Sequence, residues 1–163
     1  MANMNDLLQA LAERGLTLGS VESMTGGLFA AEATSIPGAS QVYKGGIVSY
    51  SVPVKVNNVG VEQKLIDENG VVSAPVAQAM ADHGREALGV DVCLSVTGNA
   101  GPTAEPGDAP VGSVFFGLAT KDGVWTFGYN FEGERNEIRQ AAVKMMISFG
   151  LSQFPTEVVK EDE

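Results

Sequence analysis

Hydrophobic residues follow two different spacings along this chain, and the two spacings alternate through its first two thirds. Leucines and alanines recur every three to four residues between positions 5 and 14, which predicts an amphipathic helix that ends at Gly15. The apolar, β-rich run at 90–97 instead predicts a buried central strand. By the same reasoning we expect further helices at 28–35, 53–58, 62–69, 73–88 and 135–154, and further strands at 16–22, 42–50, 111–120 and 124–131.

The order of these elements predicts the fold class. Strands and helices alternate up to residue 97, which favours parallel strands joined by helical connections. The last two strands flank Lys121-Asp122-Gly123, and Asp-Gly in such a position is typical of a tight antiparallel hairpin. We therefore expect a single three-layer α/β/α domain over residues 1–154 with a mixed, mostly parallel sheet. Residues 155–163 read as an acidic, disordered tail.

Composition and charge narrow the classes of function. The 163 residues include 20 acidic and 10 basic side chains, and the resulting net charge of −10 repels nucleic acid. No apolar run approaches the roughly 20 residues that span a membrane. A single cysteine, Cys93, and a single histidine, His83, do not make a set of soft metal ligands. We expect a cytoplasmic protein that works without a metal and binds neither nucleic acid nor a membrane.

Two glycine-rich loops that follow predicted strands are the first candidates for a ligand site. Residues 23–27, Ser-Met-Thr-Gly-Gly, precede a predicted helix, whose N-terminal N–H groups and dipole favour an anion. Residues 97–102, Thr-Gly-Asn-Ala-Gly-Pro, follow the predicted central strand. Ligands of open α/β sheets bind beyond the carboxyl ends of the strands, so both loops are suitably placed. Taken alone, each loop is explained as well or better by ordinary turn glycines.

Few side chains qualify for catalysis or for binding an anion. Lys55 can serve as the base for a serine if burial lowers its pKa, although a solvated helix lysine has the same spacing. The only histidine, His83, is not beside a glycine-flanked serine, so a Ser-His-Asp arrangement is not favoured. Arg135 and Arg139 would share one helix face suited to phosphate or carboxylate, or equally be surface charges beside glutamates. Glu22 has two possible roles, which are to orient a catalytic group or to cap the next helix.

Seven stretches occur in an order that is specific when they are taken together. They are Glu22-Ser23-x-Thr25-Gly26-Gly27, Pro37-Gly38-Ala39-Ser40, Gly45-Gly46-Ile47-Val48-Ser49-Tyr50 followed by Lys55, Gly70-Val71-Val72-Ser73, Thr97-Gly98-x-Ala100-Gly101-Pro102, Pro110-Val111-Gly112, and Phe131-x-Gly133-x-Arg135 leading to Arg139. In these motifs the chain resembles the CinA C-terminal domain family, also called the nicotinamide mononucleotide deamidases. The resemblance extends from about residue 5 to residue 153.

The resemblance implies an anticodon-binding-like α/β/α fold and an amidohydrolase without metal or organic cofactor. The implied reaction converts nicotinamide mononucleotide to nicotinic acid mononucleotide and ammonia. Carried over by position, Ser40 becomes the nucleophile, Lys55 the general base, and Thr97 a helper at the oxyanion or leaving group. Ser23 is the second choice as nucleophile. The residues that the resemblance assigns to substrate binding are Ser23, Thr25, Gly26, Gly27, Tyr50, Gly98, Arg135 and Arg139.

Three departures from the family pattern keep alternatives open. Met24 replaces a cysteine, Val52 stands where asparagine is common, and the loop at 103–109 is acidic and lacks the usual glycine pair and lysine. An acidic loop weakens the attraction for a nearby phosphate. The alternatives are a catalytically silent relative that binds a nucleotide or a protein, and a hydrolase of another small amide. The apolar final helix favours a homo-oligomer, and a dimer in particular.

Overall fold

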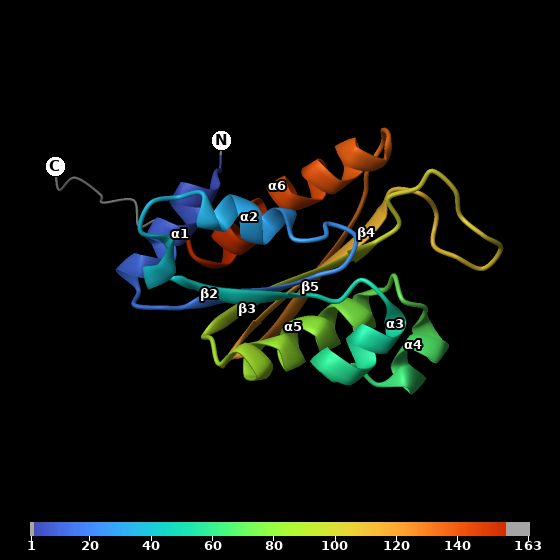
Figure 1. Cartoon of the computed structure of the whole chain (residues 1–163), viewed down its shortest axis with the longest axis horizontal. Helices are drawn as coiled ribbons and strands as arrows, with labels where there is room; N and C mark the ends of the chain where they lie inside the picture. Colours follow the sequence, from blue (N-terminus) through green and yellow to red (C-terminus); the bar gives the residue numbers. More distant parts are fainter. Residues whose placement is uncertain (1, 156–163) are drawn as a thin grey trace, which may run out of the picture.

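The computed structural model describes residues 2–155, and it consists of one five-stranded sheet with helices on both faces (Figure 1). In spatial order the sheet runs β2-β1-β3-β4-β5. β1 pairs in parallel with β2 and with β3, whereas β4 pairs antiparallel with β3 and with β5. The strands are β1 (Leu18–Glu22), β2 (Tyr43–Val48), β3 (Val92–Gly98), β4 (Ser113–Thr120) and β5 (Gly123–Asn130). The expected α/β class and mixed sheet are confirmed, with three strands in its parallel part.

Helices cover the two faces of the sheet separately (Figure 1). One face carries α1 (Met4–Glu13), α2 (Leu28–Thr34) and α6 (Arg135–Gln153), and the other carries α3 (Val52–Val54), α4 (Gln63–Asn69) and α5 (Ala74–Leu88). Two further short segments are a 3₁₀ turn, η1 (Ala39–Gln41), and a π-helical turn, η2 (Lys55–Val59). The helix predicted at 53–58 is therefore divided between α3 and η2. Of the predicted tail, residues 156–163 lie outside the part that the structure describes.

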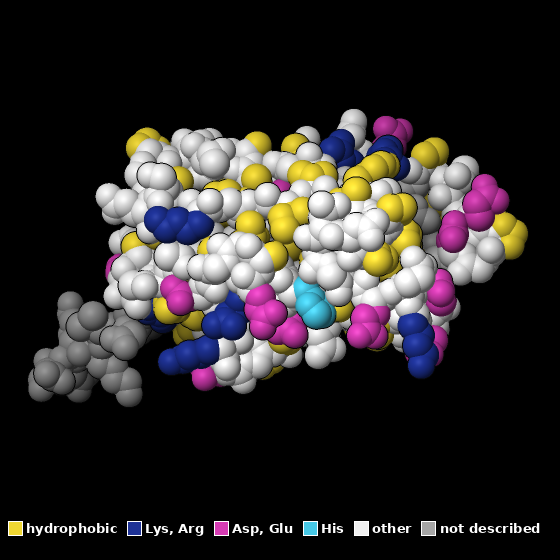
Figure 2. Space-filling model, turned by 60° about the horizontal axis from the view of Figure 1, so that its bottom comes forward, with side chains coloured by type: hydrophobic (Ala, Val, Ile, Leu, Met, Phe, Trp, Pro, Cys, Tyr) yellow, Lys and Arg dark blue, Asp and Glu magenta, His cyan; other side chains and the backbone are white. Residues whose placement is uncertain are grey.

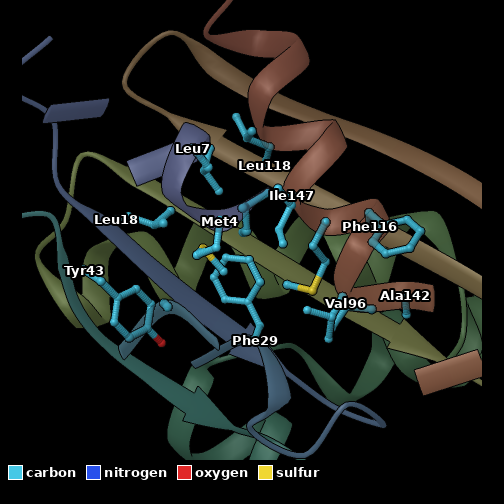
Figure 3. Close-up of a cluster of buried hydrophobic side chains, with 14 of the residues drawn as sticks. Met4, Leu7, Leu18, Phe29, Tyr43, Val96, Phe116, Leu118, Ala142 and Ile147 are labelled. Carbon is cyan, nitrogen blue, oxygen red and sulfur yellow. The ribbon is translucent and has the colours of Figure 1, made fainter. Parts of the chain in front are cut away.

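The larger hydrophobic core lies between the sheet and the layer of α1, α2 and α6 (Figure 3). Phe29 and Phe116 are fully buried in it, together with Met146 and Ile147 of α6. The buried apolar residues of α6 pack against the sheet, whereas Met145, Phe149 and Leu151 of the same helix are only partly buried. The homo-oligomer that the apolar final helix favours stays a prediction. At about 25 cal/mol per Å² of apolar surface removed from water, this layer is a main source of stability.

A smaller core lies on the other face, between the sheet and α5. Val21 of β1 and Met80 of α5 are fully buried there, as is Cys93 of β3. Burial raises the pKa of the Cys93 thiol to about 12, so this cysteine is a protonated core residue at neutral pH. Because both cores cover β1 and β3, these strands are the buried centre of the sheet, as the apolar run at 90–97 predicts.

The outer surface is charged and mixed. On the face shown in Figure 2, acidic side chains are interspersed with Lys and Arg. Among residues 2–155, no helix combines the length and the apolar composition that a membrane crossing requires. The parallel strands β1, β2 and β3 have their carboxyl ends on the same side of the sheet. A ligand site of an open α/β sheet is expected beyond these ends.

Candidate functional site

A buried lysine lies at the carboxyl ends of β1, β2 and β3. Lys55 begins η2 directly after α3, and its side chain is only 1% exposed. Ser51 caps α3 by accepting a hydrogen bond from the N–H of Val54, which turns the chain so that Lys55 reaches back under the strand ends. Its Nζ donates to the carbonyl oxygens of Ser49 at 2.6 Å and Tyr50 at 3.4 Å, and to Ser23 Oγ at 2.8 Å.

The charge of Lys55 is not balanced by an acid. Within residues 2–155, the only ion pair is the exposed Lys64–Glu68 pair on α4, so no carboxylate stabilises the ammonium. Burial therefore dominates, and it lowers the pKa of Lys55 to about 8. A lysine in this condition is an accessible proton acceptor near neutral pH, which an exposed lysine is not.

Ser23 is the first residue after β1, and a tight turn holds it beside Lys55. Its backbone N–H donates to the carbonyl of Val96 on β3, which ties the serine to the central strand. Gly26 and Gly27 have φ of 60° and 101°, values that let the chain turn directly into α2 and that other residues rarely adopt. The Ser23 side chain is buried yet lines a cavity. A hydroxyl and a lysine amine thus face each other at the carboxyl end of the sheet.

Glu22, the last residue of β1, caps α2. Its Oε1 accepts hydrogen bonds from Thr25 Oγ1 at 2.7 Å and from the N–H of Phe29 at 2.9 Å, and its Oε2 accepts from the N–H of Ala30 at 3.2 Å. The helix N-terminus is therefore occupied by a carboxylate of the chain itself. This does not fit the expectation that Thr25 and Gly26-Gly27 present an open phosphate site there. Of the two roles open for Glu22, the structure shows the cap.

Thr97 and Gly98 end β3 on the same side as Ser23. The Thr97 hydroxyl is buried and donates to the carbonyl oxygen of Val71 at 3.0 Å. A cavity of about 370 Å³ lies over these strand ends. Its lining includes Ser23, Lys55, Thr97, Gly98, Tyr50 and Arg135. The structure thus gathers these six of the residues expected at the site around one cavity.

A second cavity, of about 440 Å³, adjoins the first and shares Val71, Val72, Gly98 and Asn99 with it. Thr103, Gly107 and Asp108 of the acidic loop line its outer side. Together the two cavities are large enough for a ligand of nucleotide size, within the usual range of several hundred Å³. Asp108 lines the second cavity, so a ligand that extends from the first cavity into the second comes near an acidic residue.

The two arginines of α6 have different partners. Arg135 donates to the carbonyl oxygen of Gly101 at 2.6 Å and to the hydroxyl of Tyr50 at 3.2 Å, at the cavity wall. Tyr50 is 62% exposed, so this end of the cavity is open to solvent. Arg139, one turn later, instead donates to the carbonyl oxygen of Met24 at 2.8 Å. It braces the turn that carries the candidate serine, whereas Arg135 is a cation of the cavity itself.

Ser40 is not brought to this site. It lies in η1, before the amino end of β2, where it is exposed and its carbonyl oxygen accepts from Lys44 Nζ at 2.7 Å. β2 is parallel to β1, so its two ends lie at opposite edges of the sheet. The six residues of β2 span about 16 Å at roughly 3.3 Å per residue. The assignment of Ser40 as the partner of Lys55 is corrected accordingly, and Ser23 is the serine in contact with that lysine.

A third cavity, of about 400 Å³, lies at the amino ends of the parallel strands and is lined by Arg85, Asp91 and Trp125 among others. Among the residues that the structure describes, no serine or cysteine lines this cavity. The Asp91 carboxylate already accepts from the N–H and the hydroxyl of Thr17, and these hydrogen bonds lower its pKa. His83 lines neither this cavity nor the one over Ser23. In residues 2–155, no three His, Cys, Asp or Glu side chains are grouped as metal ligands.

A family model and the sequences of known proteins both relate this chain to CinA proteins. The CinA C-terminal domain model matches residues 2–153. A CinA-like protein of Desulfotalea psychrophila is 43% identical over 136 residues, 83% of this chain and 33% of its own length. A CinA-like protein of Geobacter metallireducens is 46% identical over 127 residues, 78% of this chain and 31% of its own length. This chain thus spans about a third of the length of these curated relatives.

Solved structures agree with the sequence relatives. A CinA superfamily protein of Klebsiella pneumoniae superposes with a TM-score of 0.88 at 27% identity, covering 93% of this chain and 98% of the other. A competence/damage-inducible protein of Agrobacterium tumefaciens gives a TM-score of 0.87 at 29% identity, covering 91% and 92%. With the family model matching nearly the whole chain, the protein belongs to the CinA C-terminal domain family.

Proposed function

We propose that this chain hydrolyses the carboxamide of nicotinamide mononucleotide, with Ser23 as the nucleophile and Lys55 as its base. The observation that carries the proposal is the 2.8 Å contact between Lys55 Nζ and Ser23 Oγ, in a cavity wall where burial lowers the pKa of the lysine to about 8. A nucleophile and a base within hydrogen-bonding reach are the minimum for covalent catalysis. The choice of substrate rests on the resemblance to the family.

The neighbours of Lys55 suit the neutral amine. An uncharged amine has two N–H groups and one lone pair, and the carbonyl oxygens of Ser49 and Tyr50 can accept both N–H groups. The lone pair is then directed at the third neighbour, the hydroxyl of Ser23. In this protonation state the serine donates the hydrogen bond, and its proton is ready to move to Lys55 as the oxygen attacks.

The reaction follows in two halves. Ser23 Oγ attacks the carboxamide carbon while Lys55 takes the hydroxyl proton, and the carbonyl oxygen becomes an oxyanion. When the carbon–nitrogen bond breaks, Lys55 gives that proton to the nitrogen, which leaves as ammonia. Water then attacks the ester, its proton passes through Lys55 to Ser23 Oγ, and the carboxylate product is released with the enzyme restored.

A donor for the oxyanion is available beside the nucleophile. Within residues 2–155, the backbone N–H of Met24 donates to no protein acceptor, and Met24 follows Ser23 in the lining of the cavity. Thr97, on the neighbouring strand end, also lines the cavity, but its hydroxyl donates its one hydrogen to the carbonyl oxygen of Val71. Donors fixed before the reaction stabilise the developing negative charge without reorganising, and removing one commonly costs about 10²–10³ in rate. Arg139 supports this geometry because it holds the Met24 carbonyl.

A second candidate is hydrolysis of a related amide without a phosphate. It is favoured by Asp108, whose carboxylate borders the adjoining cavity and would repel a phosphate that extends there. Arg135 is the cation in the first cavity that could hold a phosphate, and it has only carbonyl and hydroxyl partners. A phosphate beside Arg135 would favour the mononucleotide as substrate. A phosphate that had to lie beside Asp108 would favour an amide without a phosphate.

The test measures ammonia and product mass from nicotinamide mononucleotide and, separately, nicotinamide riboside. Ser23→Ala and Lys55→Ala should each lower turnover by about 10²–10⁴, whereas Ser40→Ala, a matched change at the exposed serine, should retain it. The folded state of each variant is checked by circular dichroism. Full activity in Ser23→Ala, or turnover of neither substrate by the parent protein, would contradict the proposal. Turnover of the riboside alone would favour the second candidate.

A further inference from the structure

The loop at 103–109 is held to the rest of the protein by hydrogen bonds from a single side chain. The loop projects from the sheet between β3 and β4, and residues 103–108 are exposed (Figure 1). Its internal hydrogen bonds join Glu105 and Asp108 to each other. Within residues 2–155, both hydrogen bonds that join the loop to another segment come from the side chain of Asn99. The position of the loop therefore depends on this one residue.

Asn99 stands on a fixed part of the sheet. It directly follows β3, and its backbone extends the pairing of β3 with β4. Its N–H donates to the carbonyl oxygen of Ser113 at 3.0 Å, and its own carbonyl oxygen accepts from the N–H of Gly112 at 2.7 Å. Asn99 also lines both the cavity over Ser23 and the adjoining second cavity. Its side chain is thus placed to fix the walls of the site.

The partners of the Asn99 side chain require an amide. Its Nδ2 donates to the carbonyl oxygen of Ala109 at 2.9 Å and, more weakly, to that of Thr103 at 3.5 Å. Its Oδ1 accepts from the N–H of Gly101 at 2.9 Å. An amide can donate to two acceptors while it accepts from a donor, whereas an ionised carboxylate of the same shape only accepts. Aspartate at this position would set a negative charge against two carbonyl oxygens and release the loop.

The same side chain also acts on the cation of the site. Gly101, whose N–H is held by Asn99, accepts a hydrogen bond from Arg135 at 2.6 Å through its carbonyl oxygen. Arg135 lines the first cavity, and Asp108 of the loop lines the second. Asn99 therefore connects the cation of one cavity with the acidic wall of the other.

We propose that Asn99 is a positioning residue that fixes Arg135 and the loop at 103–109 relative to each other. In this role, which rests on the amide hydrolysis proposed above, it sets the affinity for the part of a substrate that lies beyond the carboxamide. Within residues 2–155, Asn99 has no hydrogen bond to Ser23 or Lys55. Asn99 should therefore act on KM and leave kcat nearly unchanged.

This role predicts that the effect of Asp108 depends on Asn99. While the loop is anchored, Asp108 is held at the cavity wall, and Asp108→Asn should lower KM for nicotinamide mononucleotide. In an Asn99→Ala background the loop is released, so Asp108→Asn should change KM by less than about 1.5-fold. In an Asp108→Asn background, Asn99→Ala should raise KM roughly three- to tenfold and alter kcat by less than about twofold, because the wall and Arg135 are no longer held.

The test combines these kinetics with limited proteolysis, whose outcome does not depend on turnover. The cut sites are located by mass spectrometry. Asn99→Ala and Asn99→Asp should each speed cleavage within residues 103–109 roughly tenfold or more, since cleavage requires the loop to leave its anchored conformation. Asn5→Ala, the same change at an exposed asparagine of α1, should alter neither cleavage nor KM. Thermal unfolding checks that each variant is folded.

The two measurements separate the role of Asn99 from the proposed reaction. If the parent protein does not turn over nicotinamide mononucleotide, the proposed function fails, while the cleavage rates still decide whether Asn99 holds the loop. Cleavage of the loop that is as slow in both Asn99 variants as in the parent protein would overturn the proposal. An effect of Asp108→Asn on KM that is the same with and without Asn99 would also overturn it. So would an Asn99→Ala variant that loses kcat at unaltered KM, because Asn99 would then act on the chemistry.

Discussion

At the scale of single residues, Lys55 shows how burial selects a chemical role. Taking an ammonium out of water costs free energy, and two carbonyl oxygens recover part of that cost without carrying a full negative charge. An aspartate in the same position would have raised the pKa of the lysine and removed its lone pair at neutral pH. The backbone carbonyls of Ser49 and Tyr50 hold the amine in place while leaving it able to accept a proton.

This role predicts the pH dependence of the reaction. Because the lone pair of Lys55 exists only above its pKa, kcat/KM for nicotinamide mononucleotide should rise with pH through about 8 and level off beyond it. The measurement is a pH–rate profile of the parent protein, with unfolding checked at each pH. A profile that is flat across this range would mean that Lys55 is not the base.

The same shift in pKa affects stability, with a definite sign. Lys55 has a pKa of about 8 when folded and an ordinary value of 10.5 when unfolded, so between these values the unfolded chain binds more protons. The free energy of unfolding should therefore rise across this window in the parent protein relative to Lys55→Met. Equilibrium denaturation of both proteins at the two ends of the window separates this effect from that of other titrating groups.

The sequence offers two candidate serines as partners of Lys55, with Ser40 as the first choice and Ser23 as the second. Ser40 and Ser23 both stand in small-residue turns next to strands, and both belong to motifs of the family. They differ in which end of a strand they adjoin, because Ser40 precedes β2 and Ser23 follows β1. The relevant rule, that ligands bind beyond the carboxyl ends of strands, was available from the sequence and favours Ser23.

At the scale of elements, the long periodic segments were predictable and the short irregular ones were not. The helix expected at 73–88 is α5 (Ala74–Leu88), and the strand expected at 16–22 is β1 (Leu18–Glu22). The helix expected at 53–58 instead contains the π-helical turn η2, where the N–H groups of Gly60 and Val61 both donate to the carbonyl of Lys55. Such wide turns depend on tertiary packing, and they are frequent at functional sites.

Packing of α5 onto the sheet predicts an unusual effect of a helix-favouring substitution. Gly84 lies at the closest approach, where an added methyl group would overlap Val21 of β1 and lie 3.1 Å from Cys93 Sγ. Although alanine is the better helix former, Gly84→Ala should destabilise the fold by about 1–3 kcal/mol. Urea denaturation measures it, with Gln78→Ala on the exposed side of the same helix as the control. Equal or greater stability in Gly84→Ala would show that α5 can shift at little cost.

At the scale of the whole molecule, the distribution of charge affects how strongly the cavities attract a substrate that carries a phosphate. The chain is acidic overall, and the loop at 103–109 contains Glu105 and Asp108, of which Asp108 lines the second cavity. The loop is closed on itself, because the N–H of Glu105 donates to Asp108 Oδ2 at 3.0 Å. The loop therefore holds the acidic residue Asp108 at the wall of the second cavity.

This field predicts a substrate-dependent effect of one charge. Asp108→Asn keeps the shape of the side chain and removes its charge, so KM for nicotinamide mononucleotide should fall roughly two- to fivefold at low salt. KM for nicotinamide riboside, which lacks the phosphate, should change little. Asp82→Asn, the same change on the exposed side of α5, serves as the control. An equal effect with both substrates would mean that Asp108 acts on the shape of the loop and not on the phosphate.

The brace from Arg139 to the Ser23 turn has a consequence for the order of events during synthesis. The partners are far apart in the sequence, since Met24 follows β1 and Arg139 lies 115 residues later, in α6. On the ribosome, β1, β2 and β3 are complete long before α6 emerges, so Ser23 and Lys55 exist in a nascent chain whose turn has no brace. The cavity gains Arg135, and the Ser23 turn gains its brace from Arg139, only once α6 has been made.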